Sequence, residues 1–593
     1  MVFTLLVGIW FSRRASRSTE DFFVSGRSLP WWVVGTSMVA TTFAADTPLA
    51  VSGFVAKGGI ASNWIWWTLG FSGMTSVFLF AALWRRSGVL TDAELVELRY
   101  GGRSAAWLRC IKALWFGVFQ NVLIIAWVMA AMRKIAVVVL DLDPGSELIL
   151  YTFADGSTWA IESWAAIAFS LFAVSVFYTS AAGMWGVVTT DVVQFVLAIT
   201  IAIVFASLAW SAAGELAGIQ AGFLEHGLDW ERTAKLVPTM GTSDGSEFLL
   251  IVGVIWWGQH NLDGGGYLAQ RLFAAKNEKH AVLGYLWFTI AHICLRPWPW
   301  IVVGLAGMAM LGPAGEGLAV DDPEKYYPLL MRQLLPAGVF GLMVASFLAA
   351  FMSTIDTQLN WGASLLTNDI YRRFINPEAD EKKLVRVSRI AIFFLAALGV
   401  AGSLAIDEIG WAWKLAFSVT AGLGTVYAAR WYWWRTNAWS ELSALACAGL
   451  CTWGFWAAAD ARPDNWTLSE GGIDWFKFPG STGLTTLLTV VVWVAVTLLT
   501  RPVARDRLLE FYEKVRPGGP GWRVIAGDRV GFEKEGPTLG SFVGIVAGCV
   551  ACYGCLFAVG WLITGETASA GAAAVVSILG AGLLARQLRN TSL

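Results

Sequence analysis

The chain has 593 residues, of which 56% are hydrophobic and only 14% are charged, and its mean hydropathy is +0.59. This composition excludes a water-soluble globule and indicates a protein that crosses a membrane many times. The net charge of −1 does not indicate a nucleic-acid partner. The sequence has no GxxxxGK[ST] motif, which disfavours an ATP-driven pump.

Apolar segments of about 20 residues, each long enough for about 30 Å of hydrocarbon, follow one another along almost the whole chain. The sequence predicts fourteen spans after a short apolar leader at residues 1–11. The predicted spans lie near residues 30–56, 61–84, 105–132, 161–180, 184–210, 246–270, 281–311, 334–371, 387–406, 409–433, 439–459, 481–500, 538–564 and 570–587.

Basic residues fall in alternate loops, and acidic residues fall in the loops between them. The positive-inside rule therefore predicts a multi-pass protein of a cell inner or plasma membrane, with an external N-terminus and a cytoplasmic C-terminus. The basic set includes Arg85, Arg86, Arg99, Arg103, Arg372, Arg373, Arg501, Arg505 and Arg507. The acidic set includes Asp141, Asp143, Asp155, Asp321, Asp322, Glu324, Asp460, Asp464 and Glu470.

Two blocks of five spans, at 30–210 and 246–435, each open with a span rich in glycine, proline or polar residues. Paired interrupted spans are typical of inverted-repeat transporters, so we expect an all-α polytopic fold. The other predicted divisions are a leader and cytoplasmic loop at 1–29, an external loop at 211–245, four peripheral spans at 436–593, and a cytoplasmic connector near 501–537.

The first span of block one places Asp46, Thr47 and Pro48 at mid-membrane. Pro48 has no N–H to offer the carbonyl near Ala44, so an unwound turn could aim carbonyls and Asp46 into a cavity. A carboxylate at this depth needs a partner. The alternative is a simple kink in the helix.

The opening span of block two contains three consecutive glycines, Gly264 to Gly266, which should break its helix. Polar side chains and indoles just before them suit a polar organic solute. The alternatives are an interfacial turn that only anchors the span, and a proton-carrying role for the histidine. The predicted solute contacts are Trp257, Gln259, His260, Asn261 and Asp263.

The segment from Leu334 to Leu366 carries a polar stripe at helical spacing. Oxygen atoms on one face of a spanning helix should face the bundle interior, and hard oxygens suit a small cation such as Na⁺. Serine and threonine also bond to their own helix or join helices together, which is the alternative interpretation. The stripe consists of Ser353, Thr354, Thr357, Asn360 and Ser364.

Three basic groups, His292, Arg296 and Lys414, lie in predicted spans and need a counter-charge or water. Ion pairing and solute contact are equally good explanations of each. The acids available within the spans are Asp46, Asp191, Asp263 and Asp356. Asp191, near the cytoplasmic end of its span, is expected to be an ion ligand or an exit relay.

Several motifs over residues 18–435 resemble those of the sodium:solute symporter family, a group of Na⁺-coupled transporters of sugars, proline, sialic acid, iodide and monocarboxylates. The motifs are Asp21–Pro30, the Ala45-Asp46-Thr47 segment, Thr91–Gly101, Thr179–Gln194, Gln270-Arg271 with Ala274–Lys276, Phe351–Leu359 and Leu366–Tyr371. The resemblance implies a LeuT-type core of two inverted five-helix repeats, with the C-terminal helices peripheral.

The resemblance also implies one sodium held by the carbonyls of Ala40, Phe43 and Ala350 and the hydroxyls of Ser353 and Thr354. Some members hold a second cation, whose ligands would match Asp191, Ser353, Asp356 and Thr357. Asp356 stands where that pattern has a hydroxyl.

Sugar transporters of the family use polar side chains at positions matching Asp46, Thr47 and Trp66, and a basic residue near His292. Here Trp66 replaces an acid, and the segment around Asp263 and the sequence from Arg296 to Pro299 depart from the family pattern.

The expected function is sodium-coupled import of a small polar solute, preferably a sugar or polyol, by alternating access. Deep indoles such as Trp66 and Trp257 would stack on the apolar face of a sugar, although helix packing explains them nearly as well. The alternatives are sodium- or proton-coupled uptake of an organic acid or amino acid attracted by Arg296 or Lys414, a membrane sensor, and an intramembrane enzyme. The expected partners are the solute, Na⁺ and the lipid bilayer, with the monomer as the functional unit.

Overall fold

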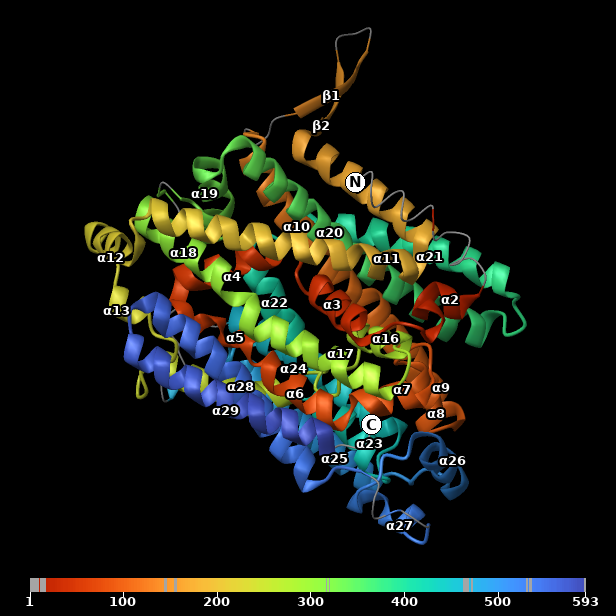
Figure 1. Cartoon of the computed structure of the whole chain (residues 1–593). Coiled ribbons are helices and arrows are strands. Elements are labelled where there is room, and N and C mark those ends of the chain that lie inside the picture. Colours follow the sequence, from red (N-terminus) through yellow and green to blue (C-terminus); the bar gives the residue numbers. More distant parts are fainter. Residues whose placement is uncertain are drawn as a thin grey trace.

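The computed structural model describes residues 10, 18–142, 147–153, 157–315, 317–318, 320–461, 469–470, 473–529, 532 and 536–590. The predicted leader, apart from Trp10, and the predicted external residues Asp143, Asp155 and Asp464 lie outside these ranges. Within them the chain is a bundle of helices with two short antiparallel hairpins (Figure 1).

The elements of the first block are α2 Thr19–Val24, η1 Ser25–Arg27, α3 Trp31–Thr41, α4 Asp46–Gly58, η2 Ile60–Asn63, α5 Trp64–Trp67, α6 Leu69–Leu79, α7 Ala81–Ser87, α8 Glu94–Arg99, α9 Gly102–Leu114, η3 Trp115–Gln120, α10 Asn121–Val139, β1 Glu147–Thr152, β2 Thr158–Glu162 and α11 Ser163–Ala212. Two short helices follow, α12 Glu215–Glu225 and α13 Trp230–Thr233. Apart from residues 161 and 162, which belong to β2, the predicted spans 161–180 and 184–210 both fall within α11.

The elements of the second block are α14 Ser243–Leu250, η4 Ile251–Ile255, α15 Trp256–Gly258, α16 Tyr267–Ala274, α17 Glu278–Ile290, η5 Ala291–Leu295, α18 Pro297–Leu311, η6 Pro323–Lys325, α19 Tyr326–Leu334, α20 Ala337–Ser364, η7 Leu365–Ile375, α21 Glu381–Ser403, α22 Ile409–Ser418 and α23 Leu423–Tyr432. The C-terminal elements are α24 Ala438–Asp460, β3 Ser469–Glu470, β4 Ile473–Asp474, α25 Gly480–Leu499, α26 Arg505–Val515, η8 Pro520–Trp522, α27 Arg523–Ala526, α28 Leu539–Thr564 and α29 Thr567–Asn590.

Among the described residues, nine helices are long and apolar enough to cross a membrane, or eleven if each of two bent helix pairs forms one span. Breaks explain two of the spans missing from this count, because helices that break mid-span fall below the length of a continuous crossing. The predicted span 161–180 lies in α11, of which the count includes only Met184–Ala212. The segment 246–270 is interrupted between Gly258 and Tyr267, and the segment 409–433 is interrupted before Gly422, which has φ 87°.

The first predicted span is broken as the sequence indicated. Helix α3 ends at Thr41, α4 begins at Asp46, and the two axes differ by 58°. The carbonyl of Ala44, which Pro48 cannot satisfy, accepts a hydrogen bond from the Thr47 amide at 3.2 Å instead. The break therefore leaves few backbone groups without a hydrogen bond.

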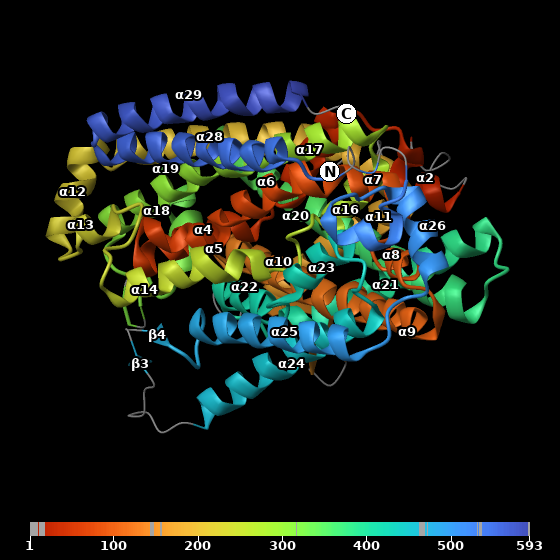
Figure 2. The same ribbon diagram turned by 90° about the horizontal axis from the view of Figure 1, so that it is seen from below.

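The two ends of the bundle carry different loops. In Figure 2, α12, α13, β3 and β4 lie at one end, and α2, α8, α9 and α26 lie at the other. Loops predicted to share the basic side contact one another there: Arg85 donates to the Ala275 carbonyl at 2.6 Å, and Arg507 donates to the Glu97 carbonyl at 2.6 Å. The alternation of loops inferred from charge agrees with these contacts.

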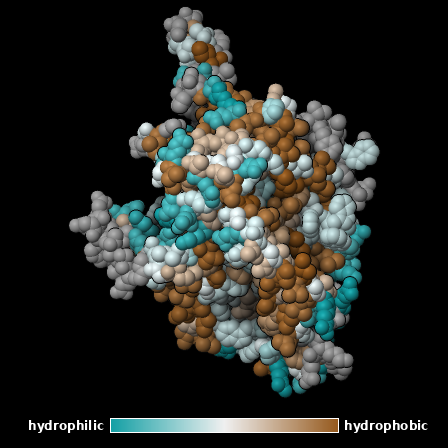
Figure 3. Space-filling view, turned by 60° about the vertical axis from the view of Figure 1, so that its left-hand side comes forward, coloured by the Kyte–Doolittle hydropathy of each residue, from teal (hydrophilic) through white to brown (hydrophobic). Residues whose placement is uncertain are grey.

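Large apolar side chains cover much of the outer surface. Figure 3 shows broad hydrophobic areas on one face between smaller hydrophilic patches. On the peripheral helices, Val491, Ile578 and Leu579 are each more than 60% exposed. Continuous exposed apolar surface of this kind is unstable in water and suits acyl chains.

Buried charges join the peripheral helix α24 to the rest of the bundle. The carboxylate of Glu441 lies 2.9 Å from Lys112 Nζ and 3.5 Å from the Arg430 guanidinium, and accepts a hydrogen bond from the Tyr100 hydroxyl at 2.8 Å. Arg430 also contacts Asp263 at 2.7 Å. Charges taken out of water are tolerated only when they are paired and hydrogen-bonded, as they are here.

Candidate functional site

A cavity of about 170 Å³ lies where the broken helices meet. One water needs about 10–15 Å³ on this measure, so the cavity has room for a small solute. Both unwound stretches reach it, residues 42–45 through Thr42 and Ala44 and residues 259–266 through His260 and Asn261. Its aromatic lining consists of Trp66, Trp127, Tyr267, Trp361, Trp413 and Phe417.

Buried polar atoms of the cavity lining have no hydrogen-bond partner among the described residues. The acceptors are Asp46 Oδ1, Gln120 Oε1, Asn261 Oδ1 and Gln358 Oε1, the donors are Arg296 Nε and Trp361 Nε1, and His292 Nε2 can act as either. An unsatisfied buried polar group costs about 1–3 kcal/mol, so such atoms normally find a partner in water or a ligand. Acceptors dominate, and they match the hydroxyl groups of a polar solute.

Asp46 connects the broken first span to α22. Its Oδ2 accepts a hydrogen bond from the Trp413 indole at 2.9 Å, and its side chain is 2% exposed. The sequence predicted that this carboxylate needs a partner. The hydrogen-bond partner in the structure is an indole, and not one of the three basic groups.

Arg296 is hydrogen-bonded to the unwound segment between α3 and α4. Its guanidinium donates to the Thr42 hydroxyl at 2.6 Å and to the Thr42 carbonyl, and Nη1 lies 2.9 Å from His292 Nδ1. The same group lies over the ring of Trp300, 5.2 Å from its centroid. Both terminal nitrogens bond to the protein, which leaves Nε and the second N–H of Nη2 as the unused donors of Arg296.

Some predicted solute contacts line the cavity and others do not. Those that line it are Asp46, Thr47, Trp66, His260, Asn261, His292 and Arg296. Those outside its lining are Trp257, Gln259, Asp263 and Lys414. The Trp257 indole donates to the Gly253 carbonyl at 2.7 Å, Gln259 donates to the Phe417 carbonyl at 3.4 Å, and Asp263 is paired with Arg430.

The polar stripe of α20 faces the broken span. The Thr354 hydroxyl donates to the Thr41 carbonyl at 3.0 Å, so the two elements meet where a shared cation would lie. The Ser353 hydroxyl donates to Asp191 Oδ1 at 2.6 Å, and Ser37 donates to Asp191 Oδ2 at 2.5 Å. Ser353, Thr354 and Asp191 are all at most 3% exposed.

The lower part of the stripe has another role. Asn360 accepts a hydrogen bond from Gln270 Nε2 at 2.7 Å, and the Ser364 hydroxyl donates to the Trp361 carbonyl of its own helix at 2.7 Å. Here the alternative interpretation, packing and back-bonding, describes the contacts.

A buried guanidinium lies in the region of the predicted second cation site. Arg271 donates to the hydroxyls of Thr41, at 2.9 Å, and Thr357, and lies 4.0 Å from Asp191. Asp356 instead accepts a hydrogen bond from Thr179 at 2.5 Å. Of the four residues suggested for that site, Ser353 and Asp191 bond to each other, whereas Thr357 and Asp356 have other partners. A fixed positive charge already faces Asp191.

Sequence reasoning missed Gln120, Gln358 and Trp413. Gln358 lies one helical turn after Thr354, so the stripe's own spacing pointed to it. Gln120 ends the π-helical segment η3, a local irregularity frequent at functional sites but not visible in the sequence. Nothing distinguishes Trp413 from the many other tryptophans of the chain.

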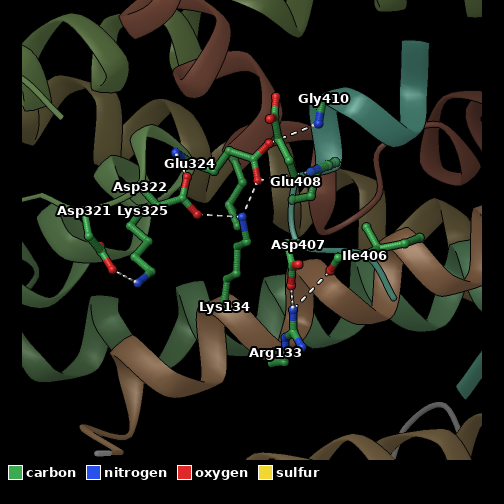
Figure 4. Close-up of polar contacts among 12 residues, drawn as sticks. Arg133, Lys134, Asp321, Asp322, Glu324, Lys325, Ile406, Asp407, Glu408 and Gly410 are labelled. Carbon is green, nitrogen blue, oxygen red and sulfur yellow. Dashed lines mark hydrogen bonds and ion pairs between the residues drawn. The ribbon is translucent and has the colours of Figure 1, made fainter. Parts of the chain in front are cut away.

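An ionic network ties together three helices that wall the cavity (Figure 4). On α10, Lys134 Nζ lies 2.6 Å from both Asp322 Oδ2 and Glu324 Oε2. Glu324 Oε1 accepts a hydrogen bond from the Gly410 amide at 3.0 Å, at the start of α22. On α4, a Cβ added to Gly53 would lie 3.0 Å from Glu324 Cγ, so this helix packs closely against the same carboxylate.

Further ion pairs extend the network at its edge. Arg133 donates to the Ile406 carbonyl at 3.1 Å, and Lys57 lies 2.8 Å from Glu408. The Lys325 ammonium, 2.7 Å from Asp321, keeps the pKa of that carboxyl below its usual value. These outer pairs are more exposed than Lys134 and contribute less.

The sequence profile of the sodium:solute symporter family matches residues 22–445. "Sodium/glucose cotransporter 4" of Danio rerio is 27% identical over 437 residues, which cover 67% of this chain and 60% of the relative. "Sodium/glucose cotransporter" of Vibrio parahaemolyticus is 28% identical over 416 residues, covering 65% of this chain and 69% of the relative. "Sodium/myo-inositol cotransporter 2" of Oryctolagus cuniculus is 26% identical, covering 67% and 59%. The chain spans about 60% of the length of the vertebrate relatives it matches.

A solved structure shares the architecture. The substrate-bound, outward-open state of a Na⁺-coupled sialic acid symporter superposes with a TM-score of 0.63 over 85% of this chain and 96% of that chain, at 18% identity. The predicted all-α polytopic fold of LeuT type is confirmed. Since the family profile covers well over half of its residues, this multi-pass membrane protein belongs to the sodium:solute symporter family.

Proposed function

We propose that this protein imports a sugar or polyol together with Na⁺ by alternating access. The observation that carries the proposal is the cavity with aromatic walls and four unsatisfied acceptors, beside a buried group of hydroxyls on α20. Aromatic faces accept the apolar face of a sugar ring, and the acceptors satisfy its hydroxyls. The relatives named for glucose and myo-inositol cotransport support the same solute class.

The sodium site of the proposal lies between the end of α3 and the middle of α20. Its oxygen ligands are the carbonyls of Ala40, Phe43 and Ala350 and the hydroxyls of Ser353 and Thr354. Sodium bound there favours the conformation in which the two helices are apposed, which is the conformation that completes the solute cavity. By linkage, each ligand then raises the affinity of the other.

We assign one sodium per cycle, because Arg271 supplies a fixed positive charge opposite Asp191. A second cation next to this guanidinium would be repelled. The proposal also places the N-terminus outside and the C-terminus in the cytoplasm of a cell inner or plasma membrane, following the basic loops, and takes the monomer as the functional unit.

The purified full chain in proteoliposomes tests the coupling. With an inward sodium gradient, we expect uptake of radiolabelled glucose or myo-inositol well above that measured when choline replaces external Na⁺ at fixed pH. Equal uptake in choline, abolished when the proton gradient is collapsed, would instead establish proton coupling. Sodium-driven uptake restricted to organic acids or amino acids within a mixed panel would overturn the solute class.

Asp46→Asn should weaken solute binding more than sodium binding. The amide keeps an oxygen for the Trp413 indole but replaces the free acceptor by a donor. A hydrogen bond to a charged group is worth about 1.5–3 kcal/mol, so the half-saturating solute concentration should rise about 10- to 100-fold. Initial uptake rates over a range of solute concentrations measure it. An unchanged value would remove Asp46 from the solute site.

Lys414→Met separates the sugar proposal from the carboxylate alternative. Lys414 lies outside the cavity lining, so uptake of sugar or polyol should change less than about twofold, as for a surface substitution. Competition by a panel of organic acids against sugar uptake should also remain unchanged. A loss of transport with normal protein abundance and thermal stability would place this ammonium in the solute path.

A further inference from the structure

A second large pocket lies on the surface at the basic end of the bundle. It has a volume of about 1260 Å³ and opens where α9 and α24 begin and where α25 ends. Figures 1 and 2 both place α8, α9 and α26 side by side at this end. It shares no lining residue with the central cavity, so the proposed transport function does not account for it.

The charged lining of this pocket is strongly positive. Four arginines line it, Arg103, Arg373, Arg501 and Arg507, against the single acid Glu97. Glu97 is already committed, because its carboxylate lies 2.6 Å from Arg109 and 3.0 Å from Arg373.

Three guanidinium groups of the pocket have unused donors. Within the described part of the chain, the exposed side chains of Arg103 and Arg501 have neither a hydrogen bond nor an ion pair. Arg507 donates to Glu510 and to the Glu97 carbonyl, but its buried Nε has no partner among the described residues. Convergent unused guanidinium donors suit the oxygens of a phosphate.

The N-terminus of helix α9 adds to the positive electrostatic potential of the pocket. Helix α9 begins at Gly102 in the pocket wall, and no side chain caps its first turn. A Cβ at Gly102 would meet nothing within 4 Å, so the approach to these amides is open. The N-terminal amides and the helix dipole favour an anion beside Arg103.

Apolar side chains at the pocket mouth place it at the membrane interface. Leu499, the last residue of the apolar helix α25, is 86% exposed, and Trp439 is 51% exposed. Both line the pocket, and Trp107, one turn along α9 from Arg103, is 67% exposed. Exposed tryptophans at the end of an apolar span are typical of the headgroup layer.

We propose that this pocket binds the phosphate of an anionic phospholipid, with the acyl chains lying along α25 beside Leu499. A phosphodiester accepts hydrogen bonds from Arg103, Arg501 and Arg507, and its glycerol lies beside Trp439. Basic pockets between transmembrane helices on the cytoplasmic side suit such headgroups, and the cytoplasmic leaflet supplies anionic lipid. A soluble phosphate ion would share the polar contacts but not the apolar ones.

The test compares the purified full chain in detergent with two double variants by native mass spectrometry during lipid titration. The site variant is Arg103→Gln with Arg501→Gln, whose side chains have no protein partner to lose. The control variant is Arg586→Gln with Arg589→Gln, which removes the same charge from exposed positions on α29 outside the pocket. Both variants should keep the wild-type thermal unfolding midpoint.

With dioleoylphosphatidylglycerol as the probe, the site variant should bind about 30-fold more weakly than wild type, from about 1 kcal/mol for each arginine. The control variant should bind as wild type does, and none of the three proteins should bind dioleoylphosphatidylcholine measurably. Equal phosphatidylglycerol binding by wild type and site variant would overturn the proposal. Displacement of the lipid by millimolar inorganic phosphate would overturn the assignment to lipid and make this a site for a free anion.

Discussion

Ser353→Ala combined with Thr354→Ala is expected to abolish sodium-stimulated uptake and leave the fold intact. The pair removes two hydroxyl ligands from the proposed sodium site, where each contact with a cation is worth about 1.5–3 kcal/mol. The half-saturating sodium concentration should therefore rise more than about 100-fold. Uptake in proteoliposomes as a function of external Na⁺ measures it.

Ser364→Ala is the matched control for the double variant. Its hydroxyl lies on the same helix but bonds to the carbonyl of Trp361. Its removal should change the sodium dependence less than about twofold, since only a local back-bond is lost. Normal sodium dependence in the double variant would reject the site between α3 and α20.

Lys134→Met is expected to impair the closing of one end of the cavity. The ammonium neutralises Asp322 and Glu324, and its loss leaves the buried Glu324 carboxylate unpaired, at a cost of about 3–5 kcal/mol. The ionic contact between α10 and α22 then breaks more often. Because the cavity then closes only rarely at this end, uptake should fall at least about 10-fold.

Labelling of Trp127→Cys by a membrane-impermeant maleimide reports that opening directly, measured against the same chain without the added cysteine. Trp127 lines the cavity two turns before Lys134, so labelling should increase several-fold in the Lys134→Met background. Arg133→Met removes the neighbouring charge, which donates to the Ile406 carbonyl and lies 3.5 Å from the exposed Asp407, and should leave labelling and uptake near wild type. Labelling unaffected by Lys134→Met would show that the network does not close the cavity.

The helix breaks that shape the site could be predicted from the sequence, because each depends on residues of its own segment. Pro48 and the run Gly264 to Gly266 act on their own helices, so both breaks could be placed from the sequence. Helical spacing also placed Ser353 and Thr354 on one face, because that periodicity is independent of the other helices.

The partners of buried charges depended on tertiary structure. Asp46 had three basic candidates within predicted spans, yet its partner is an indole from α22. The sequence distinguishes Arg271 only as part of a motif, although it donates to Thr357 and faces Asp191. Such pairings are set by the packing of helices that are distant in sequence, which no local pattern records.

The buried charges at the start of α24 bear on how small a working version of this protein could be. Ten predicted spans would complete the two repeats by residue 435, which makes that position the natural place to cut the chain for a minimal transporter. Without Glu441, however, the buried Lys112 would lose the carboxylate that lies 2.9 Å from its ammonium, while Arg430 would keep its ion pair with Asp263. The helix after the repeats therefore supplies a counter-ion to the repeats themselves, and a shortened chain would first need Lys112 replaced by a neutral side chain.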